Sequence, residues 1–153
     1  MTSRLGGILA ALLFAAGGVP AGSAGPAAAA DDVATILAGV RDQSELRLTT
    51  TGRKSGRPHT IPVWFTVDGS VVYLNTLDPT RDWVKNAQKT PEVRLDFGSV
   101  VLAGRLRTVT DEAVHARVLQ ALRDKYWAAW AGGLVGKGPK ATFVVEDLRP
   151  ATP

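Results

Sequence analysis

Short runs in which apolar residues alternate with polar ones, each followed by turn residues, occupy most of the chain after residue 45. In His59–Val67, every second residue from Ile61 onward is apolar, which is typical of a strand with one buried face. Asp68-Gly69 and Gly98-Ser99 separate neighbouring runs and favour tight turns. Runs this short predict mostly antiparallel pairing in one small sheet. Six strands are expected: Glu45–Thr51, His59–Val67, Val71–Thr76, Glu92–Phe97, Val100–Thr108 and Ala141–Leu148.

Three other segments have helical character. Asp32–Val40 is expected to be a short amphipathic helix. Pro79–Lys89 is expected to be another, because Asp78 stands before a proline at its start and Pro91 follows its end. A long helix is expected over Thr110–Ala131, with its first residue as the N-cap. The sequence therefore predicts a mainly β fold with α elements: a six-stranded antiparallel barrel with a short helix and a long C-terminal-half helix packed outside.

The first thirty residues differ in composition from the rest of the chain. Met1–Arg4 is short and basic, Leu5–Val19 is apolar, and Ala27–Ala30 supplies the small residues that a signal peptidase needs. We therefore expect residues 1–30 to be a Sec-type signal peptide and residues 31–153 to be one folded domain, exported to the periplasm, the cell envelope or the outside. A retained N-terminal anchor is the alternative, although the apolar run is short for a membrane span. The protein would be cytoplasmic if its start site is misassigned.

Composition narrows the chemistry further. The chain has no cysteine, which excludes disulfides, thiolate catalysis and thiolate metal sites. No familiar spacing of histidines and carboxylates is present, so neither a metal site nor a catalytic side chain is expected. The net charge is +4 for the whole chain and would be about +3 without Arg4. So modest an excess fits an anionic small molecule better than a nucleic acid, which is not expected as a partner.

One turn concentrates positive charge between two strand-like runs. Arg53, Lys54 and Arg57 stand beside Gly52 and Gly56. The glycines would let the backbone fold back with its N–H groups pointing outward, and the cations would surround those donors with charge. This arrangement predicts a site for a phosphate or a carboxylate. A solvated hairpin tip is the alternative.

The same turn and several later segments resemble one protein family. Residues 50–57, Thr-Thr-Gly-Arg-Lys-Ser-Gly-Arg, are similar to the signature turn of the deazaflavin-dependent nitroreductase and quinone reductase family, a branch of the flavin-binding split-barrel (pyridoxamine phosphate oxidase-like) superfamily. The resemblance runs from Glu45 to Pro150 and implies that the expected barrel is a split β-barrel. Other matching segments follow in the family's order and approximate spacing: Ile61–Phe65, Val72–Leu74, Arg81–Asn86, Pro91–Val93 and Lys125-Tyr126.

The resemblance implies an oxidoreductase that uses coenzyme F-420 (8-hydroxy-5-deazaflavin) to reduce a small quinone or nitroaromatic acceptor. Such a cofactor carries the hydride itself, so the protein need only position the ring and exclude water. The cofactor's phosphate would bind at the basic turn, and the helix Asp82–Asn86 would cover one side of the ring. The implied cofactor-binding residues are Arg53, Lys54, Ser55, Gly56, Arg57, His59, Thr60, Ile61, Pro62, Val63, Trp64, Leu74, Asn75, Thr76, Leu77, Trp83, Lys85 and Asn86.

Two aromatic residues near the end of the long helix are expected to bind the substrate. Tyr126 and Trp130 share a helix face with Leu122, at the helix end that in the family leans over the open side of the cofactor. There they would stack on the acceptor, and the phenol would offer a hydrogen bond. Core packing is the alternative. The glycine-rich segment 132–138 would suit a mobile lid or be slack chain.

The two histidines carry less information. Many family members have arginine where this chain has His59, so the phosphate affinity would be weaker or pH-dependent, unless His59 is a solvated strand residue. His115 falls within the expected long helix, where surface exposure or satisfied packing is a better explanation than catalysis.

Other functions stay open at this stage. Split-barrel relatives divide among cofactors, so flavin mononucleotide (FMN) or haem would fit the same fold. An exported, non-catalytic module that binds a small apolar ligand is a further alternative, because export by a Sec-type signal separates the protein from a cytoplasmic cofactor pool. The expected partner is a small redox acceptor, with membrane proximity only through quinones. The protein is expected to be a monomer or a homodimer.

Overall fold

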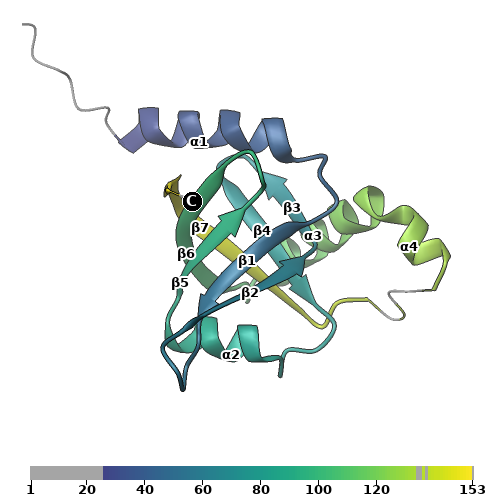
Figure 1. Cartoon of the computed structure of the whole chain (residues 1–153). Helices are drawn as coiled ribbons and strands as arrows, with labels where there is room; N and C mark the ends of the chain where they lie inside the picture. The colour runs from purple at the N-terminus through teal and green to yellow at the C-terminus, as the bar shows by residue number, and fades with distance from the viewer. Residues whose placement is uncertain (1–25, 134–135, 137, 153) are drawn as a thin grey trace, which may run out of the picture.

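A computed structural model of the chain describes residues 26–133, 136 and 138–152. The strands form one antiparallel sheet in the order β2-β1-β5-β6-β7-β4-β3, curled into a barrel (Figure 1). The strands are β1 (Leu46–Thr51), β2 (Pro58–Val63), β3 (Phe65–Asp68), β4 (Val71–Thr76), β5 (Glu92–Asp96), β6 (Val101–Thr108) and β7 (Ala141–Pro150). The helices are α1 (Pro26–Val40), α2 (Asp82–Lys89), α3 (Glu112–Lys125) and α4 (Trp127–Ala131).

The two edge strands of this sheet are consecutive in the chain. The segment predicted as one strand, His59–Val67, divides at Trp64 into β2, which pairs with β1, and β3, which pairs with β4. The predicted alternation also fails there, because Phe65 and Thr66 are both buried. The sheet therefore has seven strands where six were expected, and a single residue joins its two edges. The mainly β barrel with outer helices is confirmed.

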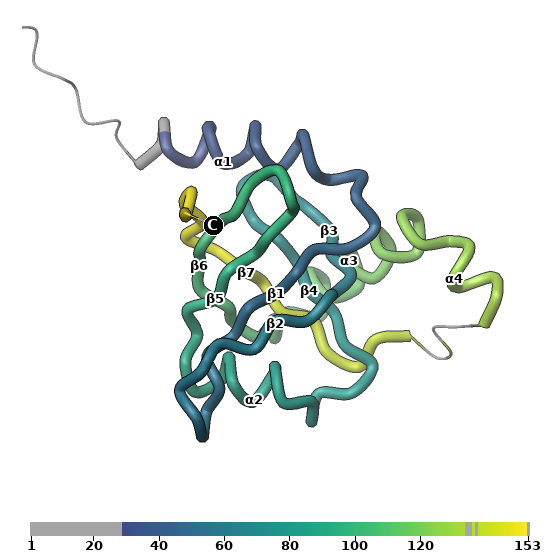
Figure 2. Tube along the Cα trace, viewed as in Figure 1, coloured from purple at the N-terminus to yellow at the C-terminus, as the bar shows by residue number. Residues whose placement is uncertain are grey.

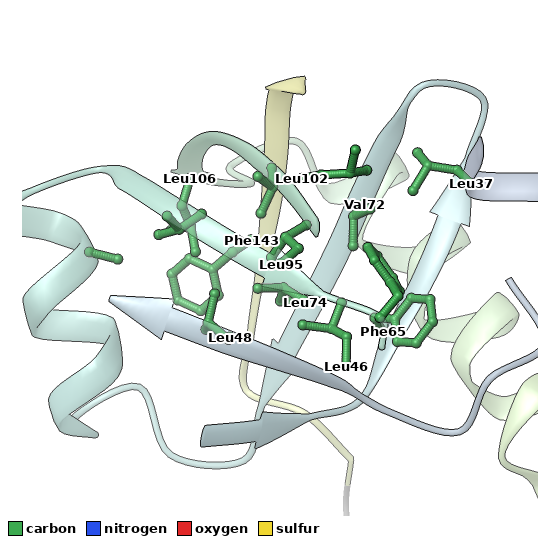
Figure 3. Close-up of a cluster of buried hydrophobic side chains, with 14 of the residues drawn as sticks. Leu37, Leu46, Leu48, Phe65, Val72, Leu74, Leu95, Leu102, Leu106 and Phe143 are labelled. Atoms are coloured by element: carbon green, nitrogen blue, oxygen red, sulfur yellow. The ribbon is translucent and has the colours of Figure 1, made fainter. Parts of the chain in front are cut away.

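The barrel interior is filled by large aliphatic and aromatic side chains from every part of the sheet. Leu48, Leu74, Leu95 and Phe143 are each at most 1% exposed and point into the same space (Figure 3). Helix α1 adds Leu37 at one end of the barrel, and α2 lies across the other (Figures 1 and 2). Helices α3 and α4 lie outside the sheet, and Val118 of α3 packs against Tyr73 and Val144 in a second, smaller buried cluster.

The helix ends differ from the sequence predictions for local reasons. Helix α2 begins at Asp82, not at residue 79, because the Asp78 carboxylate accepts hydrogen bonds from the Thr80 N–H (2.8 Å) and hydroxyl (2.6 Å) instead of capping a helix. The N-cap of α3 is Asp111, not Thr110, because the Asp111 carboxylate accepts hydrogen bonds from the backbone N–H groups of Ala113 (2.8 Å) and Val114 (3.0 Å). The expected long helix is also broken at Tyr126, which separates α3 from α4.

Helix α1 begins earlier than predicted, at Pro26. Of the expected signal peptide, residues 1–25 lie outside the described residues, and the expected cleavage after Ala30 falls within α1. The buried residues of this helix, Val33, Leu37 and Val40, all follow that point, so cleavage would keep its packing on the barrel. None of the helices in the described residues is long and apolar enough to cross a membrane.

Asp111 and Thr110 offer a matched test of the α3 cap. Asp111→Ala should lower the free energy of unfolding by about 1 kcal/mol, because two backbone N–H groups lose their acceptor. Thr110→Ala should change it by less than about 0.5 kcal/mol, the usual range for surface substitutions. Urea titration followed by circular dichroism measures both. An equal loss for the two variants would contradict the assignment of Asp111 as the cap.

Candidate functional site

A cavity of about 420 Å³ opens where the two edge strands part. The β3–β4 ladder ends at the pair Phe65–Leu74, so β4 continues through Asn75 and Thr76 without a neighbour on that side. Strand β2 leaves in the other direction, paired only with β1. We call the space between them the apolar cavity; it is lined by Ile61, Pro62, Val63, Trp64, Asn75, Thr76, Leu77, Arg81, Trp83, Leu122 and Pro139.

A second cavity, of about 750 Å³, lies next to the first. The two cavities share the side chains of Ile61, Arg81 and Trp83. We call this second space the polar cavity, because most of its lining residues carry charge or hydrogen-bonding groups. It is lined by Thr50, Gly52, Arg53, Lys54, Ser55, His59, Ile61, Asp78, Thr80, Arg81, Asp82, Trp83 and Asn86.

The basic turn forms one wall of the polar cavity and is closed by its own backbone. Gly52 N–H donates to the Arg57 carbonyl and Gly56 N–H to the Gly52 carbonyl, both at 2.8 Å. The prediction that these N–H groups point outward is therefore wrong for the two glycines. Gly56 has a φ of +69°, and a Cβ on Gly52 would come within 2.6 Å of the Ser55 hydroxyl. Gly56 is thus needed for the shape of the turn, whereas a side chain at Gly52 would displace the side chains of Ser55 and His59.

Arg53 fastens the turn to helix α2. Its guanidinium contacts the Asp82 carboxylate at 2.8 Å and donates to Asn86 Oδ1 at 3.2 Å, and its backbone N–H donates to the same oxygen at 3.0 Å. The hydrogen bond from Arg53 and its charge lower the pKa of Asp82. Asn86 is 4% exposed and bonds in turn to Thr50, while Lys89 donates to the Arg53 carbonyl. Arg53 and Asn86 therefore have structural partners already.

The charges that face the polar cavity come from both sides of it. Lys54 lies on the turn, and Arg81, the residue before α2, lies opposite and also lines the apolar cavity. Asp78 and Asp82 line the cavity as well. Hydrogen bonds from Thr80 lower the pKa of Asp78, so this carboxyl stays ionised. The cavity is consequently polar and mixed in charge, with two cations that have no salt bridge among the described residues.

Two tryptophans form flat apolar surfaces in the apolar cavity. Trp83 is 6% exposed and packs edge to face on Phe143 in the core, with ring centroids 5.3 Å apart. Trp64, at the break between β2 and β3, is stacked on Tyr126 at 4.5 Å with an interplanar angle of 6°. Each ring is therefore supported from behind, which favours a rigid slot for a flat ligand.

The Tyr126 hydroxyl is occupied by backbone groups. It donates to the Ser44 carbonyl at 2.6 Å and lies 3.2 Å from both the N–H and the carbonyl oxygen of Phe65. Burial raises the pKa of Tyr126 to about 12. The ring stands behind Trp64 and does not line either cavity. The phenol therefore has no free side toward a substrate in this arrangement, and Tyr126 instead supports the wall.

Trp130 is the second residue expected at the substrate side. Its ring packs over Gly138, where a Cβ would come within 2.8 Å of the indole, and Arg123 lies 4.8 Å from the ring centroid. The indole Nε1 is buried without a hydrogen-bond partner. Trp130 does not line either cavity, so its contact with substrate stays a prediction. Leu134, Val135 and Lys137 of the proposed lid lie outside the described residues.

Asn75 places a buried amide in the wall of the apolar cavity. Its Oδ1 accepts from the Thr142 hydroxyl at 2.8 Å, and its Nδ2 is buried without a partner. Next to it, the backbone edges of β2 and β4 face the cavity without a neighbouring strand. The free N–H and C=O groups of these two edges can bond to a ligand that lies between them. The wall therefore fits a planar heterocycle with hydrogen-bonding atoms at its rim.

The structure gathers most of the residues expected from the sequence. Arg57, Lys85 and Thr60 are exposed and line neither cavity, Gly56 shapes the turn, and Leu74 is in the core. Arg81 was missed from the sequence, although this cation lies within the expected helix Pro79–Lys89 and in a segment that resembles the family. Leu122 was missed as well, because a helical stripe does not reveal a cavity beside it. The expected cofactor-binding residues that line a cavity are Arg53, Lys54, Ser55, His59, Ile61, Pro62, Val63, Trp64, Asn75, Thr76, Leu77, Trp83 and Asn86.

Comparison with known proteins gives a family. Residues 29–133, well over half of the chain, match the F420H(2)-dependent quinone reductase family. The chain belongs to that family. It is accordingly a deazaflavin-dependent oxidoreductase that uses coenzyme F-420 and acts on a small-molecule acceptor.

Solved structures agree on the fold. An F420-H2 dependent reductase is 21% identical with a TM-score of 0.56, over 68% of this chain and 95% of its own. A conserved hypothetical protein from Mycobacterium tuberculosis is 19% identical with a TM-score of 0.58, over 76% and 79%. The haem storage protein HutZ from Vibrio cholerae is 13% identical with a TM-score of 0.54, over 79% and 92%. The split-barrel fold is thus shared with proteins of different function.

Lys125, next to Tyr126, gives a pH-dependent test of this region. Its ammonium donates to the Phe65 carbonyl at 2.9 Å, and burial lowers its pKa to about 8. Above pH 8 the folded protein loses this proton, whereas the unfolded chain keeps it until about pH 10.5, so the Lys125 contribution to stability should rise between these values. As the pH is raised from 7 to 10, the free energy of unfolding of the parent should therefore increase relative to that of Lys125→Met.

Denaturant titrations at several pH values measure this difference. Tyr126, whose pKa is raised, acts in the opposite direction only above about pH 10, where the unfolded phenol ionises first. Lys85→Met is the matched control, because Lys85 is exposed and its charge stays in water in both states. A difference between parent and Lys125→Met that is constant with pH would contradict the burial of the Lys125 ammonium.

Proposed function

We propose that this protein transfers a hydride from reduced coenzyme F-420 to a small quinone or nitroaromatic acceptor, with the cofactor lying across both cavities. The ring occupies the apolar cavity and the phosphate-bearing tail the polar cavity. The observation that carries this proposal is that the cavities are adjacent: Ile61, Arg81 and Trp83 line both spaces, which suits one ligand with a flat apolar part and a charged part. Their volumes lie in the range of small-molecule sites.

The residues around the apolar cavity suit the cofactor ring. Trp64 and Trp83 offer supported flat surfaces, and the open edges of β2 and β4 offer hydrogen bonds to its rim. Apolar walls exclude water from a reactive ring. Leu77, 45% exposed, lies at the rim of this cavity. The acceptor would approach the ring from the outer, solvent side.

The residues around the polar cavity suit a phosphate. Lys54 and Arg81 are its cations without a salt bridge among the described residues, and a phosphate between them would gain charge-assisted hydrogen bonds. Arg53 acts mainly on the turn, because Asp82 and Asn86 already take its guanidinium. Asp82 and Asp78 repel an anion, so the tail would lie on the side of Lys54 and Arg81.

The chemistry of the reaction belongs to the cofactor, which supplies a hydride when it is bound and reduced. The described residues contribute binding, orientation and exclusion of water. Tyr126 keeps its proton, bonds to backbone groups and fixes Trp64. The role of Tyr126 and Trp130 in acceptor binding, which the family resemblance implies, stays a prediction.

The test combines cofactor binding with turnover. The parent should bind coenzyme F-420 more tightly than FMN or haem in fluorescence and absorbance titrations, and should oxidise the reduced cofactor when a quinone or a nitroaromatic compound is added. The variant Lys54→Ala/Arg81→Ala should bind F-420 at least about a hundredfold more weakly, because it loses two charge-assisted contacts of about 1.5–3 kcal/mol each. Arg57→Ala is the control, and its affinity should change less than about threefold.

Each arm has an outcome that counts against the proposal. Equal affinity of the double variant and the parent for F-420 would show that the phosphate-bearing tail does not bind in the polar cavity. A large loss in Arg57→Ala would move the phosphate to the tip of the turn. Tight binding of haem or FMN with no binding of F-420 would exclude the proposed reaction for this chain.

We also propose export, on the basis of Met1–Arg4, the apolar run Leu5–Val19 and the alanines before Asp31. With its native N-terminus, the protein made in a bacterial host should be found outside the cytoplasm, with its mature end at or near Asp31. Fractionation and N-terminal sequencing measure this. Cytosolic protein that still begins at Met1 would contradict export and indicate a cytoplasmic reductase.

A further inference from the structure

The hydrogen-bond register of the sheet fixes which main-chain groups of β4 face the apolar cavity. In an antiparallel sheet, successive residues of a strand direct their N–H and C=O groups alternately to one neighbouring strand and to the other. The Val109 N–H donates to the Thr142 carbonyl at 2.9 Å, so Thr142 on β7 directs its main-chain groups away from β4. Asn75, its partner on β4, therefore directs its own N–H and C=O to the opposite side, where β3 would lie.

No strand takes up these two groups of Asn75. The ladder between β3 and β4 stops at the pair Phe65–Leu74, and the preceding residue, Trp64, leads away to Val63, which pairs with β1. Within the described residues, the Asn75 main chain forms no hydrogen bond on this side. Asn75 lines the apolar cavity and is partly exposed, so a donor and an acceptor of one residue face this space.

The neighbouring main-chain groups at the same opening have side-chain partners. The Phe65 N–H donates to the Tyr126 hydroxyl at 3.2 Å, and the Phe65 carbonyl accepts from the Lys125 ammonium at 2.9 Å. Side chains thus close the edge of β3, whereas the edge of β4 stays open at Asn75. Main-chain groups away from bulk water need partners, and a ligand in the apolar cavity can supply them.

The edge of β2 offers a different set of groups. The Gly52 N–H donates to the Arg57 carbonyl at 2.8 Å, so the same alternation directs the main-chain groups of Thr60 and Pro62 to the open side of β2. Of these two residues, only Pro62 lines the apolar cavity, and a proline has no N–H. At this position β2 therefore presents an acceptor without a donor, and the donor–acceptor pair belongs to β4.

We propose that the Asn75 main chain selects the ligand ring by an edge on which a C=O and an N–H stand side by side, as in a lactam or an imide. The Asn75 N–H donates to the ring carbonyl, and the Asn75 carbonyl accepts from the ring N–H. The two bonds together point that edge of the ring at β4. Because main-chain groups make both bonds, the selection does not depend on the Asn75 side chain, whose Nδ2 is buried.

This donor–acceptor pair decides between classes of cofactor. Flavins and deazaflavins carry a pyrimidinedione ring with an imide edge, whereas the rim of a porphyrin macrocycle has none. The Asn75 main chain therefore acts against haem and does not distinguish a flavin from a deazaflavin. The inference rests on the proposed function for the place of the ring in the apolar cavity. The open edge of β4 is a property of the protein alone.

The first experiment measures the β4 edge in the protein without cofactor. Amide hydrogen exchange, followed by NMR on the nitrogen-15-labelled full chain, compares Asn75 with Leu74, which is directed to β7. We expect the Asn75 amide to exchange at least about a hundredfold faster than the Leu74 amide. Adding 5-deazariboflavin should slow the exchange of Asn75 and move its amide proton downfield. Equal protection of the two amides in the free protein would overturn the proposal.

The second experiment changes the ligand. In 3-methyl-5-deazariboflavin a methyl group replaces the imide proton, so its dissociation constant in fluorescence titrations should be at least about tenfold higher than that of 5-deazariboflavin. The matched control lacks one methyl group of the benzenoid ring, at the far end, and should stay within about fivefold. Equal affinity of 5-deazariboflavin and its 3-methyl derivative, or no binding of 5-deazariboflavin, would refute the selection by Asn75.

The third experiment changes the protein. Asn75→Ala and Asn75→Pro both remove the side-chain amide, but only proline also removes the N–H. Asn75→Pro should therefore bind 5-deazariboflavin at least about tenfold more weakly than Asn75→Ala. Melting temperatures show whether both variants are folded, and equal affinity of two folded variants would count against the proposal. If Asn75→Pro does not fold, amide exchange and the methylated ligand decide the question.

The proposed function and this inference can fail separately. If the parent requires the imide proton for binding but does not oxidise reduced F-420, the proposed function fails and the selection by Asn75 stands. If reduced F-420 is oxidised while 3-methylation of the ring leaves binding unchanged, the proposed function stands and the role of Asn75 is wrong.

Discussion

The interruption between strands β2 and β3 at Trp64 is the constraint on which the rest of the structure depends. One continuous segment pairs with β1 before this residue and with β4 after it, so it closes the sheet and also forces its two edges apart. The backbone groups of Phe65 at the break are held by Tyr126 and Lys125 from the end of α3. Closure and cavity thus have one origin, because a strand that stayed in a single ladder would leave no space between β2 and β4.

A second constraint acts at the opposite end of β2. The basic turn is fastened to α2 by Arg53, Asp82 and Asn86, which fixes the distance between the turn and Arg81. The positive charge of Arg53 therefore holds the turn against α2. The Arg53–Asp82 ion pair fixes the position of the opening of the polar cavity. This explains how a protein with a small net charge can still present two cations to one anionic group.

The same barrel serves proteins of different function, as the haem storage protein among its structural neighbours illustrates. The fold therefore does not select the cofactor, and selection comes from the side chains that line the cavities. In this chain those are two supported tryptophans, the open edges of β2 and β4, and cations at the far end. A flat heterocycle with an anionic tail satisfies all of these features together. Export, if it occurs, adds the requirement that the cofactor be loaded after the chain has crossed the membrane.

The sequence by itself determined what depends on neighbours in the chain. Alternation and turn residues placed nearly every strand, glycines marked the turn, and the motif around Gly52 identified the family. Only the tertiary structure decided the split of His59–Val67. The alternation of apolar and polar residues does not reveal that the two halves of this segment pair with different strands. It also decided that Tyr126 supports Trp64, that Arg53 is an ion-pair partner of Asp82 and that Arg81 faces both cavities. Each of these roles is set by a partner distant in sequence, and the physical reason is that burial and hydrogen bonding follow spatial contact, which periodicity and composition do not encode.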